Sequence, residues 1–429
     1  MIKGWKATTI RDAAQFTSKP RYIDLKIAEK VPFVPMDLVP QDRSFIQDCV
    51  WKPGRDIRSG TYFEKGDCLL AKITPCFENG KQGIAKDLPA SFGYASTELI
   101  PFRGRAGLSN KYFLFFFFLD TTTRRLIAQK MEGATGRQRI PISVLKDWPI
   151  SLPPLPEQKK IAAVLLKLQQ AIETQEKIIQ SLRDLKASTM QHLFTHGLHG
   201  EKTKQTEIGP IPESWEVSTL GDLCGTNGSC IQTGPFGSQL HAADYQDTGV
   251  PVVNPTHMLD NAIIHEGIPC ISQANADRLG RHRLKQGDIL FARRGEIGRH
   301  ALVTESEIGW LCGTGCFLVR VRNNLILDSF LSWFLYSQQS QNWLAAHAAG
   351  AIMPNLNNTI LKACPIAFPS TKAEQKHIVE TLSGIDTKAF HHQSKKSALQ
   401  DLFKTTLNKL MTGDIRVTDL DIDTKEVEE

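Results

Sequence analysis

Residues 152–182 read LPPLPEQKKIAAVLLKLQQAIETQEKIIQSL, a proline-rich stop followed by a long run without glycine or proline. Proline and glycine are the residues that most often interrupt helices, so this run predicts one long helix. A second stretch at residues 370–382, STKAEQKHIVETL, begins in the same way. Its Glu374-Gln375-Lys376 repeats Glu157-Gln158-Lys159 at an offset of 217 residues. The chain therefore starts the same helix twice, about half its length apart.

The two helix starts belong to a repeat that extends over the whole chain. The segment WKATTIRDA, which begins at Trp5, matches WEVSTLGDL, which begins at Trp215. The segment KGDCLLAK at Lys65 likewise matches QGDILFAR at Gln286. Of the 39 helix positions that begin with the two Glu-Gln-Lys starts, 11 are identical. A period this long indicates a duplicated domain and not a solenoid.

Each half has the same expected order, a globular module followed by a long helix. We expect an α/β (α+β) fold with two similar modules, separated by two long helices that form an antiparallel coiled coil with internal pseudo-two-fold symmetry. The expected parts are a first module at 1–152, a central helical spacer at 153–197, a second module at 198–369, a C-terminal helical spacer at 370–413 and a disordered acidic tail at 414–429.

Both helices carry apolar residues at the alternating four- and three-residue spacing of a heptad repeat. Each apolar stripe needs a partner surface, and the simplest solution buries the two stripes against each other. The second stripe is polar in its middle, at HHQSKK (residues 391–396). The helices either space two recognition modules or serve only to dimerise or stiffen the chain. The expected seam residues are Ile161, Leu165, Leu168, Ile172, Ile179, Leu182, Ile378, Leu382, Ile385 and Leu399.

Length and composition indicate two or three globular domains. The chain has 429 residues, 41% of them hydrophobic and 22% charged, which is typical of a soluble globular protein. Its net charge is +6, but residues 414–429 contain seven acidic and two basic residues, so the remainder carries +11. This excess makes a polyanion a reasonable partner. Nine scattered cysteines without a CxxC pair, and no signal peptide, favour a reducing cytoplasmic location.

The ordered motifs resemble the specificity (S) subunits of type I restriction–modification enzymes. The second module carries EIGPIPESWEVSTLGDL, QTGPFGSQLHAADY and GDILFARRGEIGR in this order, and the resemblance covers nearly the whole chain. It implies that each module reads one half of a bipartite, asymmetric double-stranded DNA target. It also implies that the helices set the gap and hold two methyltransferase (M) subunits and, through them, restriction (R) subunits. No membrane partner is expected.

A search for catalytic motifs supports a non-catalytic subunit without a cofactor. The sequence has no methyltransferase NPPY-like strip, no phosphate loop, no GxSxG elbow and no HExxH. The pairs Cys224/Cys230 and Cys312/Cys316 are poorly spaced for zinc, so we expect buried thiols in strands and no metal. The alternatives are a stand-alone restriction or modification enzyme, and a coiled-coil scaffold that does not recognise DNA.

Candidate DNA-contacting residues lie in loops that follow expected strands. Arginine suits such loops because its planar fork can bridge guanine O6 and N7, or bind phosphate. The loops after KGDCLLAK and QGDILFAR differ in side chains while their flanks match, as two different half-sites require. The candidates are Lys72, Asn79, Lys81, Gln82, Arg137, Gln138, Arg139, Ser238, Gln239, Arg281, Arg283, Arg293, Arg294 and Arg299.

Overall fold

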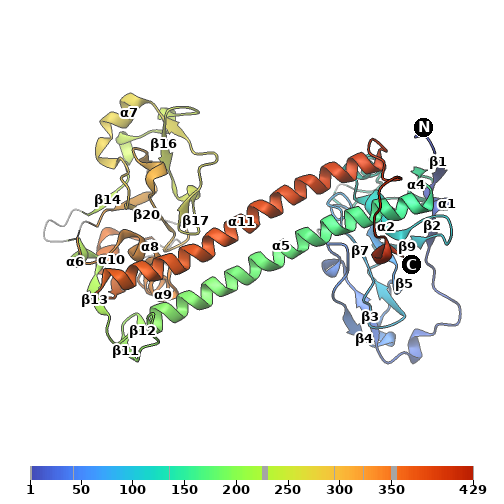
Figure 1. Ribbon diagram of the computed structural model, residues 1–429, viewed down its shortest axis with the longest axis horizontal. Coiled ribbons are helices and arrows are strands. Elements are labelled where there is room, and N and C mark those ends of the chain that lie inside the picture. Colours follow the sequence, from blue (N-terminus) through green and yellow to red (C-terminus); the bar gives the residue numbers. More distant parts are fainter. Residues whose placement is uncertain are drawn as a thin grey trace. The chain divides into compact units, whose positions relative to one another are not determined.

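The computed structural model describes residues 2–41, 43–134, 136–224, 230–293, 295–321, 323–348 and 355–428 (Figure 1). It divides into two compact units, the first made of Met1–Ile179 and His391–Glu429 and the second of Gln180–Phe390. Each unit holds one α/β module together with part of both long helices, α5 (Leu155–His196) and α11 (Lys372–Met411). The expected fold of two similar α/β modules and two long helices is confirmed.

The first module contains two four-stranded sheets and one short pairing of its outer strands. Strand β1 (Lys6–Thr9) pairs antiparallel with β10 (Pro149–Leu152), which closes the module before α5 begins. The first sheet has the order β2-β9-β6-β7 and the second β4-β3-β8-β5, in which β3 and β8 are parallel. The remaining bounds are β2 Ala14–Phe16, β3 Val31–Val34, β4 Val50–Lys52, β5 Thr61–Glu64, β6 Cys68–Ala71, β7 Gln82–Ile84, β8 Phe92–Ala95, β9 Leu99–Gly104, α1 Ile10–Ala13, α2 Lys111–Leu119, α3 Thr121–Ala128 and α4 Ile142–Lys146.

The second module repeats the outer strand pair and the first of these sheets, whereas its other sheet has the order β15-β19-β16-β22. Strand β13 (Glu216–Thr219) pairs with β24 (Pro365–Phe368) as β1 pairs with β10. The sheet β14-β23-β20-β21 corresponds to β2-β9-β6-β7, and the parallel pair β16/β22 corresponds to β3/β8. A hairpin of β11 (Thr203–Thr206) and β12 (Gly209–Pro212) precedes the module. The remaining bounds are β14 Ile231–Thr233, β15 Tyr245–Gln246, β16 Val250–Val253, β17 Met258–Leu259, β18 Ala262–Ile263, β19 Cys270–Ile271, β20 Ile289–Ala292, β21 His300–Leu302, β22 Leu311–Cys312, β23 Cys316–Val319, α6 Leu220–Leu223, α7 Gln273–Arg278, α8 Asp328–Tyr336, α9 Gln338–His347 and α10 Asn358–Ala363.

The repeated Glu-Gln start joins each long helix to its own module. In the first unit Glu157 accepts a hydrogen bond from the Trp5 indole at 3.2 Å, and in the second Glu374 accepts one from Trp215 at 3.2 Å. Gln158, which is fully buried, accepts from the Asn110 backbone N–H and donates to two carbonyls. Its counterpart in the second helix makes the same three bonds. The motif is repeated because it satisfies buried backbone groups at the same junction.

The two long helices run antiparallel within each unit. In the first unit His392 Nδ1 lies 2.8 Å from the Gln175 side chain, and Lys396 forms a 2.8 Å ion pair with Glu176. In the second unit Lys186 forms a 2.8 Å ion pair with Asp386. Polar side chains in the middle of the seam are therefore paired between helices, which removes most of the cost of placing them there. Of the expected seam residues, Leu168, Leu182, Ile385 and Leu399 are half-buried and the other six are buried.

The acidic tail, which its charge predicts to be disordered, packs against the first module as far as residue 428. Val427 is fully buried, and its carbonyl accepts a 2.7 Å hydrogen bond from the Asn110 side chain. Arg416 forms an ion pair of 2.6 Å with the buried carboxylate of Glu157. Counting charges alone did not predict this packing, because a few apolar residues and one arginine attach the tail to the first module.

Candidate nucleic-acid interface

Three segments of the first module meet at one edge of the sheet β2-β9-β6-β7. The end of β6 meets the start of β9 through a 2.9 Å bond from the Lys72 N–H to the Glu98 carbonyl. The segment around Gln138 meets both, because the Ile140 N–H donates to the Lys72 carbonyl and the Thr74 N–H to the Gln138 carbonyl, each at 2.9 Å. Loops from distant parts of the sequence therefore form one surface.

Charged and polar side chains gather on this edge. Arg139 is half exposed and forms an ion pair with Glu98 at 2.7 Å, in which Nε and Nη2 both donate to the carboxylate. The hydrogen bonds from Arg139 lower the pKa of Glu98, and the charge of Lys72 acts in the same direction. Arg137 and Asn79 are exposed, and Lys72 and Gln138 are half-buried.

Gln82 is wrong as a surface candidate. It lies in β7, is 2% exposed, and donates its side-chain N–H to the Phe115 carbonyl at 2.7 Å. Strand alternation turns this side chain toward helix α2, which the loop-based reasoning did not anticipate. The neighbouring Lys81 is half-buried, and its backbone N–H donates to the Cys76 carbonyl.

The second module forms the same edge with different side chains. The Arg293 N–H donates to the Gly315 carbonyl at 2.9 Å, and the Leu356 N–H donates to the Arg293 carbonyl at 3.1 Å. Arg293 thus corresponds to Lys72 by backbone contacts as well as by sequence. Its guanidinium lies 5.3 Å from the centre of the Phe317 ring. Arg299, on the same turn, binds the carboxylate of Glu296.

Arg281 and Arg283 belong to a different segment, the short helix η7 (Gly280–His282) and the residue after it. Arg281 is exposed and donates from Nε to His282 at 3.1 Å, while the other ring nitrogen of His282 lies 2.9 Å from the Gln232 side chain. Burial, aided by the charge of Arg281, lowers the pKa of His282 to about 4. Arg283 is half-buried, forms an ion pair with the exposed Asp277 at 2.7 Å, and donates to the Gly309 carbonyl.

The remaining candidates are only partly described. Gln239 is half-buried in η4 (Gly237–Gln239), and its carbonyl accepts a 2.9 Å hydrogen bond from Arg278. Arg294 and the side chain of Ser238 lie outside the described residues.

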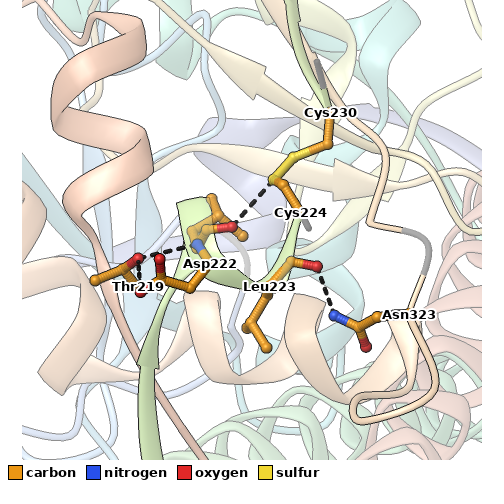
Figure 2. Close-up of a disulfide and its surroundings, with 7 residues drawn as sticks. Thr219, Asp222, Leu223, Cys224, Cys230 and Asn323 are labelled. Carbon is orange, nitrogen blue, oxygen red and sulfur yellow. Dashed lines mark hydrogen bonds between the residues drawn. A yellow bond between two sulfur atoms is a disulfide. The ribbon is translucent and has the colours of Figure 1, made fainter. Parts of the chain in front are cut away.

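The cysteines of the second module follow the sequence expectation only in part. Cys312 and Cys316 are buried free thiols in β22 and β23, as expected. Cys224 and Cys230 instead form a disulfide, shown in Figure 2 beside the Thr219–Asp222 cap of α6. Within the described ranges, no group of three or more His, Cys, Asp or Glu residues could hold a metal ion. No helix in the described part of the chain is long and apolar enough to cross a membrane.

Glu98 is the residue of this edge that sequence reasoning missed. The internal repeat contains a signal that can identify Glu98. Glu98 aligns with Gly315, and Arg139, which precedes Ile140, aligns with Asn355, which precedes Leu356. Two positions that change together from an opposite-charge pair to uncharged residues indicate a contact that differs between the modules.

The fold and its repeated edge define a duplicated two-module protein, whose modules share a backbone scaffold but not the side chains displayed on it. A model of the type I restriction modification DNA specificity domain matches residues 2–184 and 212–400. The chain therefore belongs to the specificity-subunit family of type I restriction–modification systems.

Individual relatives agree with this assignment. The type I restriction enzyme MjaVIII specificity subunit of Methanocaldococcus jannaschii is 27% identical over 316 residues, which cover 71% of each chain. The EcoAI specificity subunit of Escherichia coli is 30% identical over 214 residues, 49% of this chain and 35% of that one. The crystal structure of the type I S subunit from M. genitalium matches with a TM-score of 0.60 at 16% identity and covers 95% of this chain and 96% of that chain, a similarity of fold.

Proposed function

We propose that this chain is the DNA-reading, non-catalytic subunit of a type I restriction–modification enzyme. Each module reads one half of a bipartite, asymmetric duplex target, and the helix pair sets the gap between the halves. Two methyltransferase subunits dock on the chain, and restriction subunits join through them. The observation that carries the proposal is the repeated sheet edge, on which matching backbone bonds present Lys72, Glu98 and Arg139 in one module but Arg293, Gly315 and Asn355 in the other.

Charge supports the choice of a polyanionic ligand. Outside the acidic tail the chain carries +11, and exposed or half-buried basic side chains lie on the loops of both edges. Such residues supply phosphate contacts, while their forked or amide-bearing neighbours can read base edges. Different side chains at one place on two copies of a scaffold are what two unlike half-sites require.

The test is a binding selection on randomised duplex DNA, with the chain co-purified with its methyltransferase. The expected product is a motif of two unlike short blocks separated by a fixed gap. Formation of a stable complex that enriches no motif would reject the proposal in favour of a scaffold role.

A further inference from the structure

The ion pair between Glu98 and Arg139 fixes the arginine side chain and leaves it accessible to a ligand. The carboxylate accepts from Nε at 2.9 Å and from Nη2 at 2.7 Å, so the guanidinium plane is fixed by two bonds. The Glu98 side chain is 22% exposed and that of Arg139 is 48% exposed. The pair is therefore anchored on its glutamate side and open to solvent on its arginine side.

The fold does not need this pair. In the second module the equivalent backbone bonds, from Arg293 to Gly315 and from Leu356 to Arg293, form at 2.9 and 3.1 Å without it. There the carboxylate position is a glycine, which has no side chain. A surface ion pair of this kind also contributes little to stability. The Glu98–Arg139 pair is therefore available to contact a ligand of the first module.

The hydrogen-bond donors of Arg139 remain partly available. A guanidinium has five N–H donors. Glu98 takes the Nε hydrogen and one Nη2 hydrogen, and the Arg137 carbonyl accepts one from Nη1 at 3.3 Å. Counting partners among the described residues, one hydrogen is then left on each terminal nitrogen. Two donors on one fixed plane can match the O6 and N7 acceptors that guanine presents in the major groove.

We propose that Arg139 reads a guanine in the half-site of the first module, and that Glu98 is the positioning residue that holds its guanidinium. This inference rests on the proposed function and deepens it, because it names one base and the side chain that selects it. A phosphate is the competing ligand for the same donors. Phosphate would be satisfied by any nearby positive charge, whereas guanine requires the planar fork.

The experiment is the DNA selection on the intact complex with methyltransferase, repeated with Arg139→Lys and Glu98→Gln. Wild type is expected to enrich guanine at one position of one half-site. Arg139→Lys keeps the charge but not the fork, so the preference for guanine at that position should fall about tenfold or more. Glu98→Gln should weaken the same preference in the same direction. The other positions and the second half-site should stay unchanged in both variants. Arg139→Lys, which keeps the charge, should also leave binding to non-specific DNA unchanged.

A matched control is Asp147→Asn, which breaks the exposed ion pair between Arg11 and Asp147 in the same module. Arg11 lies near the opposite edge of the sheet, since its carbonyl accepts from Arg105, which follows the far end of β9. This variant should leave every base preference intact.

Two results would overturn the inference. One is an unchanged motif in both edge variants, which is the result that a phosphate contact predicts, because lysine keeps the charge that a phosphate needs. The other is a loss of affinity in Arg139→Lys that is the same at all DNA sequences. Either result leaves the proposed function standing, because the wild-type motif is still bipartite. Absence of any wild-type motif would instead reject the proposed function itself.

Discussion

Gln158 and Gln375 occupy matching positions of the sequence repeat and make matching hydrogen bonds in the two units. Gln375 accepts from the Leu327 N–H at 2.8 Å and donates to the carbonyls of Leu325 and Pro369 at 2.8 and 3.0 Å, as Gln158 does in the other unit. Both side chains are completely inaccessible to solvent. An amide is suited to this position because it is both a donor and an acceptor.

Replacing Gln375 with alanine should destabilise the second unit by about 1 to 3 kcal/mol, since three backbone groups lose their hydrogen bonds to a fully buried side chain. The loss can be measured as a lower melting temperature and faster hydrogen exchange in that unit. Its neighbour Lys376 is exposed, so Lys376→Ala should change stability by less than about 0.5 kcal/mol. Equal effects of the two substitutions would contradict the role assigned to the glutamine.

His282 makes stability depend on pH. Its folded-state pKa of about 4 lies below the ordinary value of 6.5, because burial disfavours the charged ring. As pH falls below 6.5, the unfolded chain takes up a proton and the folded chain does not, so stability is lost down to about pH 4. Between pH 7 and pH 5 this residue should cost about 2 kcal/mol. The variant His282→Gln should show a loss smaller by that amount in urea unfolding, and parallel pH profiles would count against the assignment.

At the scale of elements, the C-terminal tail completes the first module. Arg416 pairs with Glu157, whose carboxylate also accepts from the Trp5 indole and is 2% exposed. The guanidinium lies 5.7 Å from the centre of the Trp5 ring. The tail therefore covers the junction between β1 and the start of α5.

Truncating Arg416 to alanine should destabilise the first unit, because it leaves a buried carboxylate without its counter-charge. Adding Glu157→Gln should recover a large part of this loss, since the neutral amide can still bind the indole. Thermal unfolding of the two single variants and the double variant measures this coupling. Strict additivity of the two changes would show that the residues do not interact.

The polar centre of the helix seam contains an ion pair between the two helices. Lys396 and Glu176 are 22% and 16% exposed, so their charges are largely removed from water. Glu176→Lys should destabilise the first unit by about 1 to 3 kcal/mol through like-charge repulsion, and Lys396→Glu in the same chain should restore most of it. Circular dichroism during thermal unfolding measures the stability of both variants. If the double variant is no more stable than Glu176→Lys alone, the two residues do not interact.

At the scale of the whole molecule, each long helix begins in one unit and ends in the other. An insertion in both helices therefore changes the connection between the modules without touching either core. Adding one heptad after Ile179 and one after Phe390 preserves the apolar spacing and lengthens each helix by about 10 Å.

With this double insertion, the DNA selection should return the same two blocks with a longer gap. A single insertion in only one helix is the control, because it breaks the register and should reduce binding. An unchanged gap in the double variant would remove the spacer role from the helices.

The sequence by itself determined the duplication, the two long helices and the α/β class of the modules. These follow from local signals: proline stops, heptad spacing, matched segments and the repeated Glu-Gln start. It also located the loops that differ between the modules, and so the edge on which Lys72, Arg139 and Arg293 lie.

Only the tertiary structure decided which side chains on that edge are exposed and which bind one another. Gln82 turns inward because of strand alternation, Glu98 joins Arg139 from 41 residues away, and the acidic tail packs because Arg416 meets a buried carboxylate. Contacts between residues distant in sequence depend on sheet register and strand direction. Those are properties of the folded chain that no local pattern contains.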